Sequence, residues 1–277
     1  MSGWVELHGR GLHSGKRCSV RLDARPGPLL FRMGQSEASL EQLELVRADQ
    51  GVCLRPRQGG VEVDLCEHLL SALAGLNVRS GLTVSVPGPE VPLLDGGSRE
   101  LARALRILPL RREPSRLRVT RTEVLVDGAS RYTFEPGDAA RVAVEVDFPG
   151  ALGRASAEHG ADDTEAYLAT IATARTFGFL AQADELRARG RALHVDPAAV
   201  VALDEGGCAL PPSAPFSAEE AARHKLLDLM GDLFLYGGPP LGRVSAVRPG
   251  HAASHRVMQR ALEAGVVRKL QTGDLER

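Results

Sequence analysis

The stretch that decides the fold is residues 217–236, which read S-A-E-E-A-A-R-H-K-L-L-D-L-M-G-D-L-F-L-Y. Ser217 followed three residues later by Glu220 is a typical helix start, and the glycines and prolines at 237–240 end the segment. Apolar residues recur at helical spacing and predict a buried stripe on one face: Leu226, Leu227, Met230, Leu233 and Phe234. The stretch therefore predicts one long helix that packs against the core.

The other face of this helix carries His224, Asp228 and Asp232 at intervals of four residues, so their side chains lie in a narrow band. Lys225 falls close to Asp232 around the helix axis. An imidazole and a carboxylate one turn apart can ligate one metal ion from a rigid element. The same spacing also occurs on ordinary solvated helix faces, where such a pair contributes about 0.3 kcal/mol. The spacing alone leaves both interpretations open.

The composition is that of an ordinary globular protein, with 43% hydrophobic and 25% charged residues in a chain of 277. This length suffices for one large domain or two smaller ones. The net charge of −1 gives no reason to expect a nucleic-acid partner. We expect no transmembrane segment, because no apolar run is long enough, and no signal peptide at the amino terminus. The four cysteines lack C-x-x-C spacing and favour free thiols in the cytoplasm.

Alternation of apolar and polar residues predicts groups of strands within residues 3–35 and 117–148, and a helix follows each group. Between the two halves, the segment L-R-R-E-P at 110–114 interrupts the pattern with charges and a proline. We therefore place a domain boundary there. It divides the chain into an N-terminal domain, residues 1–112, and a C-terminal domain, residues 113–277.

The helix predicted for the first half covers residues 65–76, with Asp64 in position to cap it. In both halves a histidine of the helix stands seven residues before a glycine: His68 and Gly75, and His224 and Gly231. The matching order predicts an α+β fold of two similar two-layer α/β sandwich domains, a duplicated unit, with the active site between them. If the two helices lie side by side, their histidines meet, as in a zinc site built from two helices.

Distinctive blocks occur along nearly the whole chain, in this order: G-R-G-L-H-S-G-K, E-H-L-L-S-A-L-A-G-L, E-V-P-L-L-D-G-G-S, A-R-T-F-G-F-L, R-H-K-L-L-D-L-M-G-D-L-F and P-G-H-A. With these blocks the sequence resembles the bacterial UDP-3-O-acyl-N-acetylglucosamine deacetylases of the LpxC type, the zinc amidases that commit the cell to lipid A synthesis. The resemblance implies zinc-dependent hydrolysis of the acetamide on a UDP-linked, 3-O-acylated glucosamine.

The resemblance also implies a role for individual residues. It implies one catalytic zinc ion (Zn2+) with three protein ligands: His68, His224 and Asp228. It implies that Glu67 is the general base and His251 the general acid. It also implies that the Asp232 carboxylate orients His251 and that the Thr176 hydroxyl holds the oxyanion. It implies substrate contacts at further positions: Leu12, His13, Arg121, Phe177, Phe179, Lys225 and Arg248.

The resemblance further implies that an insert at about 181–206 forms the passage for the acyl chain, and we expect residues 193–203 to line an apolar groove. Some positions depart from the family pattern, among them D-Q-G-V at 49–52. Two alternatives therefore stay open: a paralogous zinc amidohydrolase for another acylated amino sugar, and a catalytically weak regulatory homologue. We expect a monomer, with His159 in a loop and His255 at the surface.

Overall fold

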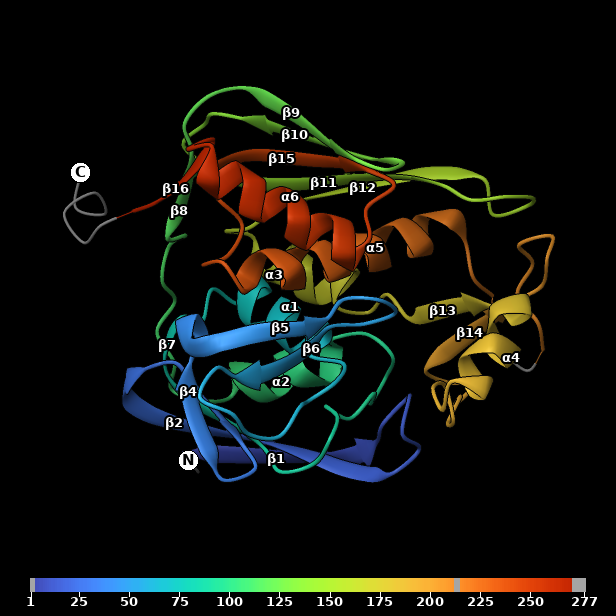
Figure 1. The fold of residues 1–277 in the computed structure, drawn as a ribbon, viewed down its shortest axis with the longest axis horizontal. Coiled ribbons are helices and arrows are strands. Elements are labelled where there is room, and N and C mark those ends of the chain that lie inside the picture. Colours follow the sequence, from blue (N-terminus) through green and yellow to red (C-terminus); the bar gives the residue numbers. More distant parts are fainter. Residues whose placement is uncertain (1–2, 212–214, 271–277) are drawn as a thin grey trace.

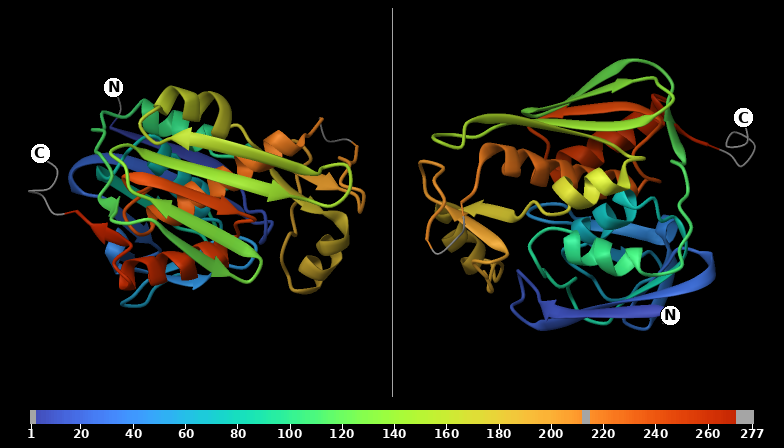
Figure 2. Two further views of the ribbon diagram at one scale, coloured as in Figure 1. Left: turned by 90° about the horizontal axis from the view of Figure 1, so that it is seen from above. Right: turned by 180° about the vertical axis from the view of Figure 1, so that it is seen from behind.

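The computed structural model describes residues 3–211 and 215–270. Two five-stranded sheets form its outer layers, and helices from both halves of the chain fill the space between them (Figure 1). The principal helices of this inner part are α1 (Glu67–Gly75), α2 (Arg99–Arg106), α5 (Ala218–Phe234) and α6 (His251–Glu263). Seen from behind, the molecule shows the same order of layers (Figure 2). Among the described residues, no helix combines the length and apolar character that crossing a bilayer requires.

The sheet of the N-terminal half has the strand order β1-β2-β7-β3-β4. Its strands are β1 (Trp4–Arg10), β2 (Arg17–Pro28), β3 (Leu30–Met33), β4 (Ser36–Ser39) and β7 (Ser80–Val86). Only β3 and β7 run parallel, and the other neighbours are antiparallel. The central strand β7 therefore lies between the first and second pairs of strands, and it directly follows α1 in the chain.

The sheet of the C-terminal half repeats this arrangement, with the order β9-β10-β15-β11-β12. Its strands are β9 (Glu123–Asp127), β10 (Ser130–Glu135), β11 (Ala140–Asp147), β12 (Arg154–Gly160) and β15 (Gly242–Val247). Again only the central strand β15 and the third strand β11 run parallel. In each half a helix precedes the central strand and another follows it. The predicted α+β fold of two similar units is thus confirmed. We propose 1–112 and 113–277 as the limits of the two units; residues 1–2, 212–214 and 271–277 lie outside the described residues.

The helices α1 and α5 pack directly against each other in the middle of the molecule. Gly231 allows this approach, because a Cβ atom there would lie 2.2 Å from the carbonyl oxygen of Glu67. Gly75 is also a close-approach position, since its Cβ would lie 2.4 Å from the ring of Tyr167. The two glycines that repeat in the sequence are therefore sites where only glycine fits between neighbouring elements.

The two halves differ in what connects the fourth strand to the first helix. In the first half the connection is short and holds η1 (Leu40–Gln42), β5 (Leu43–Arg47) and β6 (Cys53–Pro56). In the second half it holds α3 (Thr164–Ala166), η2 (Tyr167–Ile171), β13 (Thr176–Phe179), α4 (Leu180–Ala188) and β14 (Val200–Leu203). We call residues 176–203 the arm, because they extend beyond the layered body (Figure 1). A small pair of strands, β8 (Leu117–Val119) and β16 (Val267–Lys269), closes the other end.

Three expectations about single residues are wrong. Asp64 does not cap α1, whose N-cap is Cys66, because the Asp64 carboxylate binds the guanidinium of Arg47 instead. His159 lies in β12 rather than in a loop and is buried beside the ring of Tyr167. His255 is not at the surface but is 2% exposed, because it lies on the inner face of α6. In each case a partner distant in the sequence decides the environment.

Candidate active site

A cavity of about 640 Å³ lies where the two halves meet the arm. At one end its lining comes from α1, α5 and the first turn of α6. At the other end the lining comes from β13, α4 and β14, which form the arm. Most residues predicted for the site line it: Leu12, His13, Glu67, His68, Thr176, Phe177, Phe179, His224, Lys225, Asp228 and His251.

His68 from α1 and His224 and Asp228 from α5 form a buried cluster at the inner end of the cavity. Their candidate ligand atoms all lie within 4.8 Å of one another. Asp228 Oδ1 is 3.6 Å from His224 Nε2 and 3.9 Å from His68 Nε2, and it has no hydrogen-bond partner among the described residues. Leaving a buried carboxylate oxygen without a partner is costly. The cluster is therefore compatible with a metal site, with two imidazoles and one carboxylate as ligands.

The second nitrogen of His224 supports this arrangement. Nδ1 lies 3.1 Å from the carbonyl oxygen of Ala174, so an N–H there donates to the carbonyl and leaves Nε2 free for a metal ion. Burial and the neighbouring His224 ring lower the pKa of His68 to about 3, and burial also lowers the pKa of His224. Both rings are therefore neutral near pH 7, which is the form of histidine that binds metals.

Lys225 holds the other oxygen of the same carboxylate. Its Nζ donates to Asp228 Oδ2 at 2.7 Å and lies 5.6 Å from the centre of the Phe177 ring. Burial would raise the pKa of Asp228, but positive charges nearby, chiefly that of Lys225 and also that of His251, keep that pKa well below its usual range. Asp228 is therefore ionised, with one oxygen fixed by Lys225 and the other directed at the two imidazoles.

Glu67 lies beside this cluster, in the first turn of α1. Its Oε2 accepts a hydrogen bond of 2.8 Å from the amide of Val52, which comes from the loop between β5 and β6. The side chain is buried, and burial raises the pKa of Glu67 to about 7. A carboxyl group whose pKa lies near the working pH can both take up and release a proton.

His251 opens α6 and faces the same cluster, with Nε2 3.8 Å from Asp228 Oδ2. Its Nδ1 is 2.8 Å from Asp232 Oδ1. Burial would lower the pKa of His251, but the carboxylates of Asp232 and Asp228 outweigh burial and raise it to about 10. His255, four residues on, brings Nε2 to 3.4 Å from the same Asp232 oxygen. Sequence reasoning missed His255, although its spacing from His251 on one helix face was the available signal.

Thr176 and Phe177 begin the arm and line the cavity next to the cluster. The Thr176 hydroxyl donates to the carbonyl oxygen of Gly96 at 2.6 Å, so its only proton is engaged there. Phe177 packs edge-on against His224, with ring centres 5.8 Å apart. The arm thus contacts the candidate metal-binding residues through Phe177 and His224, and Thr176 must turn away from Gly96 to donate elsewhere.

The outer part of the cavity is apolar and belongs to the arm. Val195, Val200 and Ala202 line it, together with Phe179. Val201, between two of these residues, points away from the cavity and is fully buried in a separate cluster with Leu152, Leu203 and Ala221. Within the segment expected to form a groove, strand β14 therefore contributes alternate residues only, as the side-chain period of a strand requires.

Arg121 and Arg248, also expected to contact substrate, are not among the residues that line this cavity. Arg121 pairs with Glu123 and donates to the carbonyl oxygen of Ala264. Arg248 donates to Asp147 at 2.7 Å on the surface of the second sheet. The lining includes charged residues that sequence reasoning missed: Asp127, Arg187 and Arg256.

Comparisons with known proteins show the family to which the chain belongs. The family model of UDP-3-O-acyl N-acetylglycosamine deacetylase matches residues 1–263. The UDP-3-O-acyl-N-acetylglucosamine deacetylase of Myxococcus xanthus is 31% identical over 272 residues, which cover 95% of this chain and 85% of the relative. The enzymes of the same name from Acidithiobacillus ferrooxidans and Shewanella denitrificans are 31% and 30% identical and align with 92% and 93% of this chain, and with 86% and 87% of their own length. The resemblance inferred from the sequence blocks is therefore confirmed, and the chain belongs to the UDP-3-O-acyl N-acetylglycosamine deacetylase family.

Proposed function

We propose that this chain hydrolyses the acetamide of UDP-3-O-acyl-N-acetylglucosamine, the committed step of lipid A biosynthesis, with one bound zinc ion. The observation that carries the proposal is the convergence of His68, His224 and Asp228 with Glu67 and His251 in one cavity. Family membership supports the substrate, since the relatives carry the name of this reaction. Both halves of the site come from a single chain, which supports a monomer.

His68, His224 and Asp228 would hold the zinc ion. When bound there, zinc supplies Lewis-acid chemistry, because it makes a water molecule more acidic and polarises a carbonyl group. Glu67 takes the proton of the attacking water, and the Val52 amide keeps its carboxylate in place for this step. Thr176 turns from Gly96 to donate to the oxygen of the former carbonyl as it gains negative charge.

His251 acts on the leaving group. An amine leaves readily only after it is protonated, and Asp232 keeps His251 in the protonated form that can supply the proton. Lys225 and Phe177 line the cavity beside the cluster, and this supports a contact of both with the glucosamine. The apolar outer part of the cavity receives the acyl chain, because burying each methylene contributes about 0.8 kcal/mol.

We place the reaction in the cytoplasm. The cysteines of the described residues, Cys18, Cys53, Cys66 and Cys208, are all free, which fits a reducing compartment.

The test is acetate release from the UDP-linked, 3-O-acylated substrate by purified protein, with zinc measured on the same sample. UDP-N-acetylglucosamine without the acyl chain serves as the control substrate. We expect about one zinc per chain and turnover of the acylated compound only. Zinc without acetate release would instead indicate another acylated amino sugar, and absence of both would indicate a regulatory homologue.

A further inference from the structure

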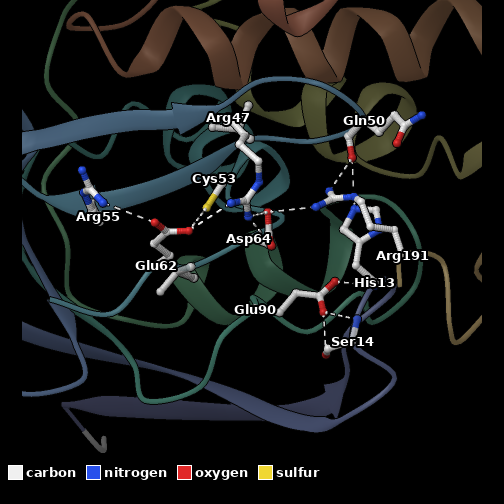
Figure 3. A network of polar contacts seen from close by, with 12 residues as sticks. His13, Ser14, Arg47, Gln50, Cys53, Arg55, Glu62, Asp64, Glu90 and Arg191 are labelled. Carbon is white, nitrogen blue, oxygen red and sulfur yellow. Dashed lines mark hydrogen bonds and ion pairs between the residues drawn. The ribbon is translucent and has the colours of Figure 1, made fainter. Parts of the chain in front are cut away.

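Arg191, just beyond the end of α4, reaches from the arm back to the N-terminal half (Figure 3). Its Nη2 donates to the carbonyl oxygen of Gln50 at 3.2 Å, and its Nη1 lies 3.6 Å from Asp64 Oδ1. The side chains of Arg191 and Asp64 are only 15% and 19% exposed. The neighbouring pair Arg189–Glu185 is 59% and 64% exposed, and such exposed pairs contribute little to stability. The Arg191–Asp64 pair therefore differs from the surface ion pair of the arm in being largely buried.

The orientation of the Asp64 carboxylate is fixed by Arg47, independently of Arg191. Arg47 Nη2 donates to both carboxylate oxygens of Asp64, at 3.0 and 2.9 Å, and Arg47 Nη1 donates to Glu62 (Figure 3). A carboxylate held in this way from one side presents its remaining lone pairs in a fixed direction. The binding site for the Arg191 guanidinium is thus formed by residues of the N-terminal half alone.

The carbonyl oxygen of Gln50 has a second partner, His13 Nε2, at 3.0 Å. Burial and the charge of Arg191 lower the pKa of His13, so the ring is neutral. Its Nε2–H then donates to Gln50, and its Nδ1 accepts from the amide of Ala192 at 3.4 Å. The next two amides, of Leu193 and His194, donate to the carbonyl oxygens of His13 and Leu12 at 3.2 and 3.1 Å. Arg191 is therefore the charged end of a seam that joins the arm to the body.

The turn at Gln50 is also connected to Glu67, through the amide of Val52. Gln50 has a φ of 60° and Gly51 a φ of 118°, so both residues of the turn have a positive φ. This backbone conformation is unfavourable for Gln50, because Gln50 carries a side chain. The next amide, of Val52, donates to Glu67 Oε2 at 2.8 Å. The two hydrogen bonds to the Gln50 carbonyl oxygen thus hold a turn whose last amide fixes the carboxylate beside the metal cluster.

We propose that Arg191 is a positioning residue, which holds the arm against the N-terminal half and, through the Gln50 carbonyl, holds the turn that presents the Val52 amide to Glu67. One side chain then keeps both the cavity wall and the general base in place. The role of Glu67 in this inference rests on the proposed function, whereas the contacts themselves do not.

The first experiment needs no activity. Amide hydrogen exchange is measured at single residues in the full-length protein, in Arg191→Leu, and in the matched control Arg189→Leu, which removes an exposed arginine from the same arm. In Arg191→Leu we expect the amides of Leu193, His194 and Val52 to exchange about tenfold faster or more, as loss of a hydrogen bond to a charged group requires. Arg189→Leu leaves all three unchanged.

Arg191→Lys gives a second measurement with the positive charge kept. A lysine cannot reach a carboxylate and a carbonyl with one planar fork, so we expect an intermediate increase in exchange at the same amides. Unchanged exchange in both Arg191 variants overturns the proposal. Faster exchange at Leu193 and His194 with Val52 unchanged overturns the link to Glu67.

The second experiment measures kcat and KM for the acylated substrate at matched zinc content. Arg191→Leu lowers kcat about tenfold because Glu67 is less well placed, and it raises KM because the wall of the cavity opens. A residue needed only for folding would lower the amount of active enzyme and leave KM unchanged, and that result overturns a positioning role. If the unmutated chain releases no acetate, the proposed function fails, and the exchange rates still decide the role of Arg191.

Discussion

The helices α1 and α5 occupy the same place in the two halves, yet they contribute different chemistry. His68 and His224 correspond, because each precedes by seven residues a glycine at a close approach. By the same spacing, Asp228 and Asp232 of α5 correspond to Ala72 and Leu76, which are apolar and buried. Duplication therefore explains the two imidazoles, whereas the carboxylates beside the imidazole pair and His251, those of Asp228 and Asp232, belong to one helix only.

The same asymmetry holds for the connections that lead into these helices. The shorter connection of the first half contains the turn at Gln50 and Gly51, between β5 and β6, which holds the carboxylate of Glu67 through the amide of Val52. The longer connection of the second half forms the arm, which lines the cavity. A symmetrical scaffold thus brings two helices together, and differences between its halves supply the proposed base, Glu67, on one side and the apolar wall of the cavity on the other.

The largest expected effect comes from removing one imidazole from either helix. His68→Ala and His224→Ala should each lose most of the bound zinc and essentially all activity, because each leaves the ion with only two protein ligands. Zinc per chain and acetate release are measured on the same samples, with His8→Ala, an exposed histidine of β1, as control. Full zinc occupancy in either variant would show that the two helices do not share one metal ion.

A smaller loss of activity is expected when the residues proposed to transfer protons are substituted. Glu67→Gln and His251→Ala should keep zinc and lose about 10²–10⁴-fold in kcat each. Glu67 works ionised, so the rate rises as the pH passes its pKa of about 7. His251 works protonated, so the rate falls as the pH passes its pKa of about 10. A bound cation favours the deprotonated form of both groups, so each limb lies at or below these values in the zinc-loaded enzyme.

The pH profile of kcat/KM checks this assignment. The alkaline limb should disappear in His251→Ala, and the acid limb in Glu67→Gln. If the alkaline limb persisted without His251, a different residue would have to protonate the leaving amine.

Much of the fold was predictable because local patterns and the tertiary structure agree. The helix expected at 217–236 is α5, Ala218–Phe234, and the repeated histidine and glycine indicated the pairing of α1 with α5. The strand β12 was missed because its sequence, R-A-S-A-E-H-G, has small residues and weak alternation. Its pairing with β11, which is a tertiary interaction, makes it a strand.

The candidate site was less predictable where position depends on the path of the backbone. In the run V-V-A-L of β14 both faces are apolar, so only the register shows that Val200 and Ala202 face the cavity and Val201 does not. Arg191 belongs to no motif, and its partners are distant in the sequence. The proposed metal ligands and proton-transfer residues stand in distinctive sequence blocks, whereas residues that hold a loop or a cavity wall leave no local pattern.

Alanine substitutions at the two close-approach glycines should distinguish an effect on stability from an effect on catalysis. Gly231→Ala and Gly75→Ala should each lower the free energy of unfolding by about 1–3 kcal/mol, because the added methyl group overlaps a neighbouring element. At Gly231 the atom it meets is the backbone oxygen of Glu67, and at Gly75 it is the ring of Tyr167. Only Gly231→Ala should therefore also lower kcat of the folded enzyme. Denaturant unfolding and kcat at matched zinc content measure the two effects, and equal kcat losses would contradict the difference.

The smallest effect is expected in the arm, where adjacent residues face opposite ways. Ala202→Trp fills part of the apolar cavity and should lower kcat/KM for a long acyl chain about tenfold more than for a short one, as exclusion of about two methylenes requires. Val201→Trp overfills the cluster with Leu152 and Leu203, so it should reduce stability and affect all chain lengths alike. Rates are compared over a series of chain lengths, with thermal unfolding measured for both variants. Equal losses at every length in Ala202→Trp would mean that the acyl chain lies elsewhere, and that the arm shapes the cavity of this chain without selecting its substrate.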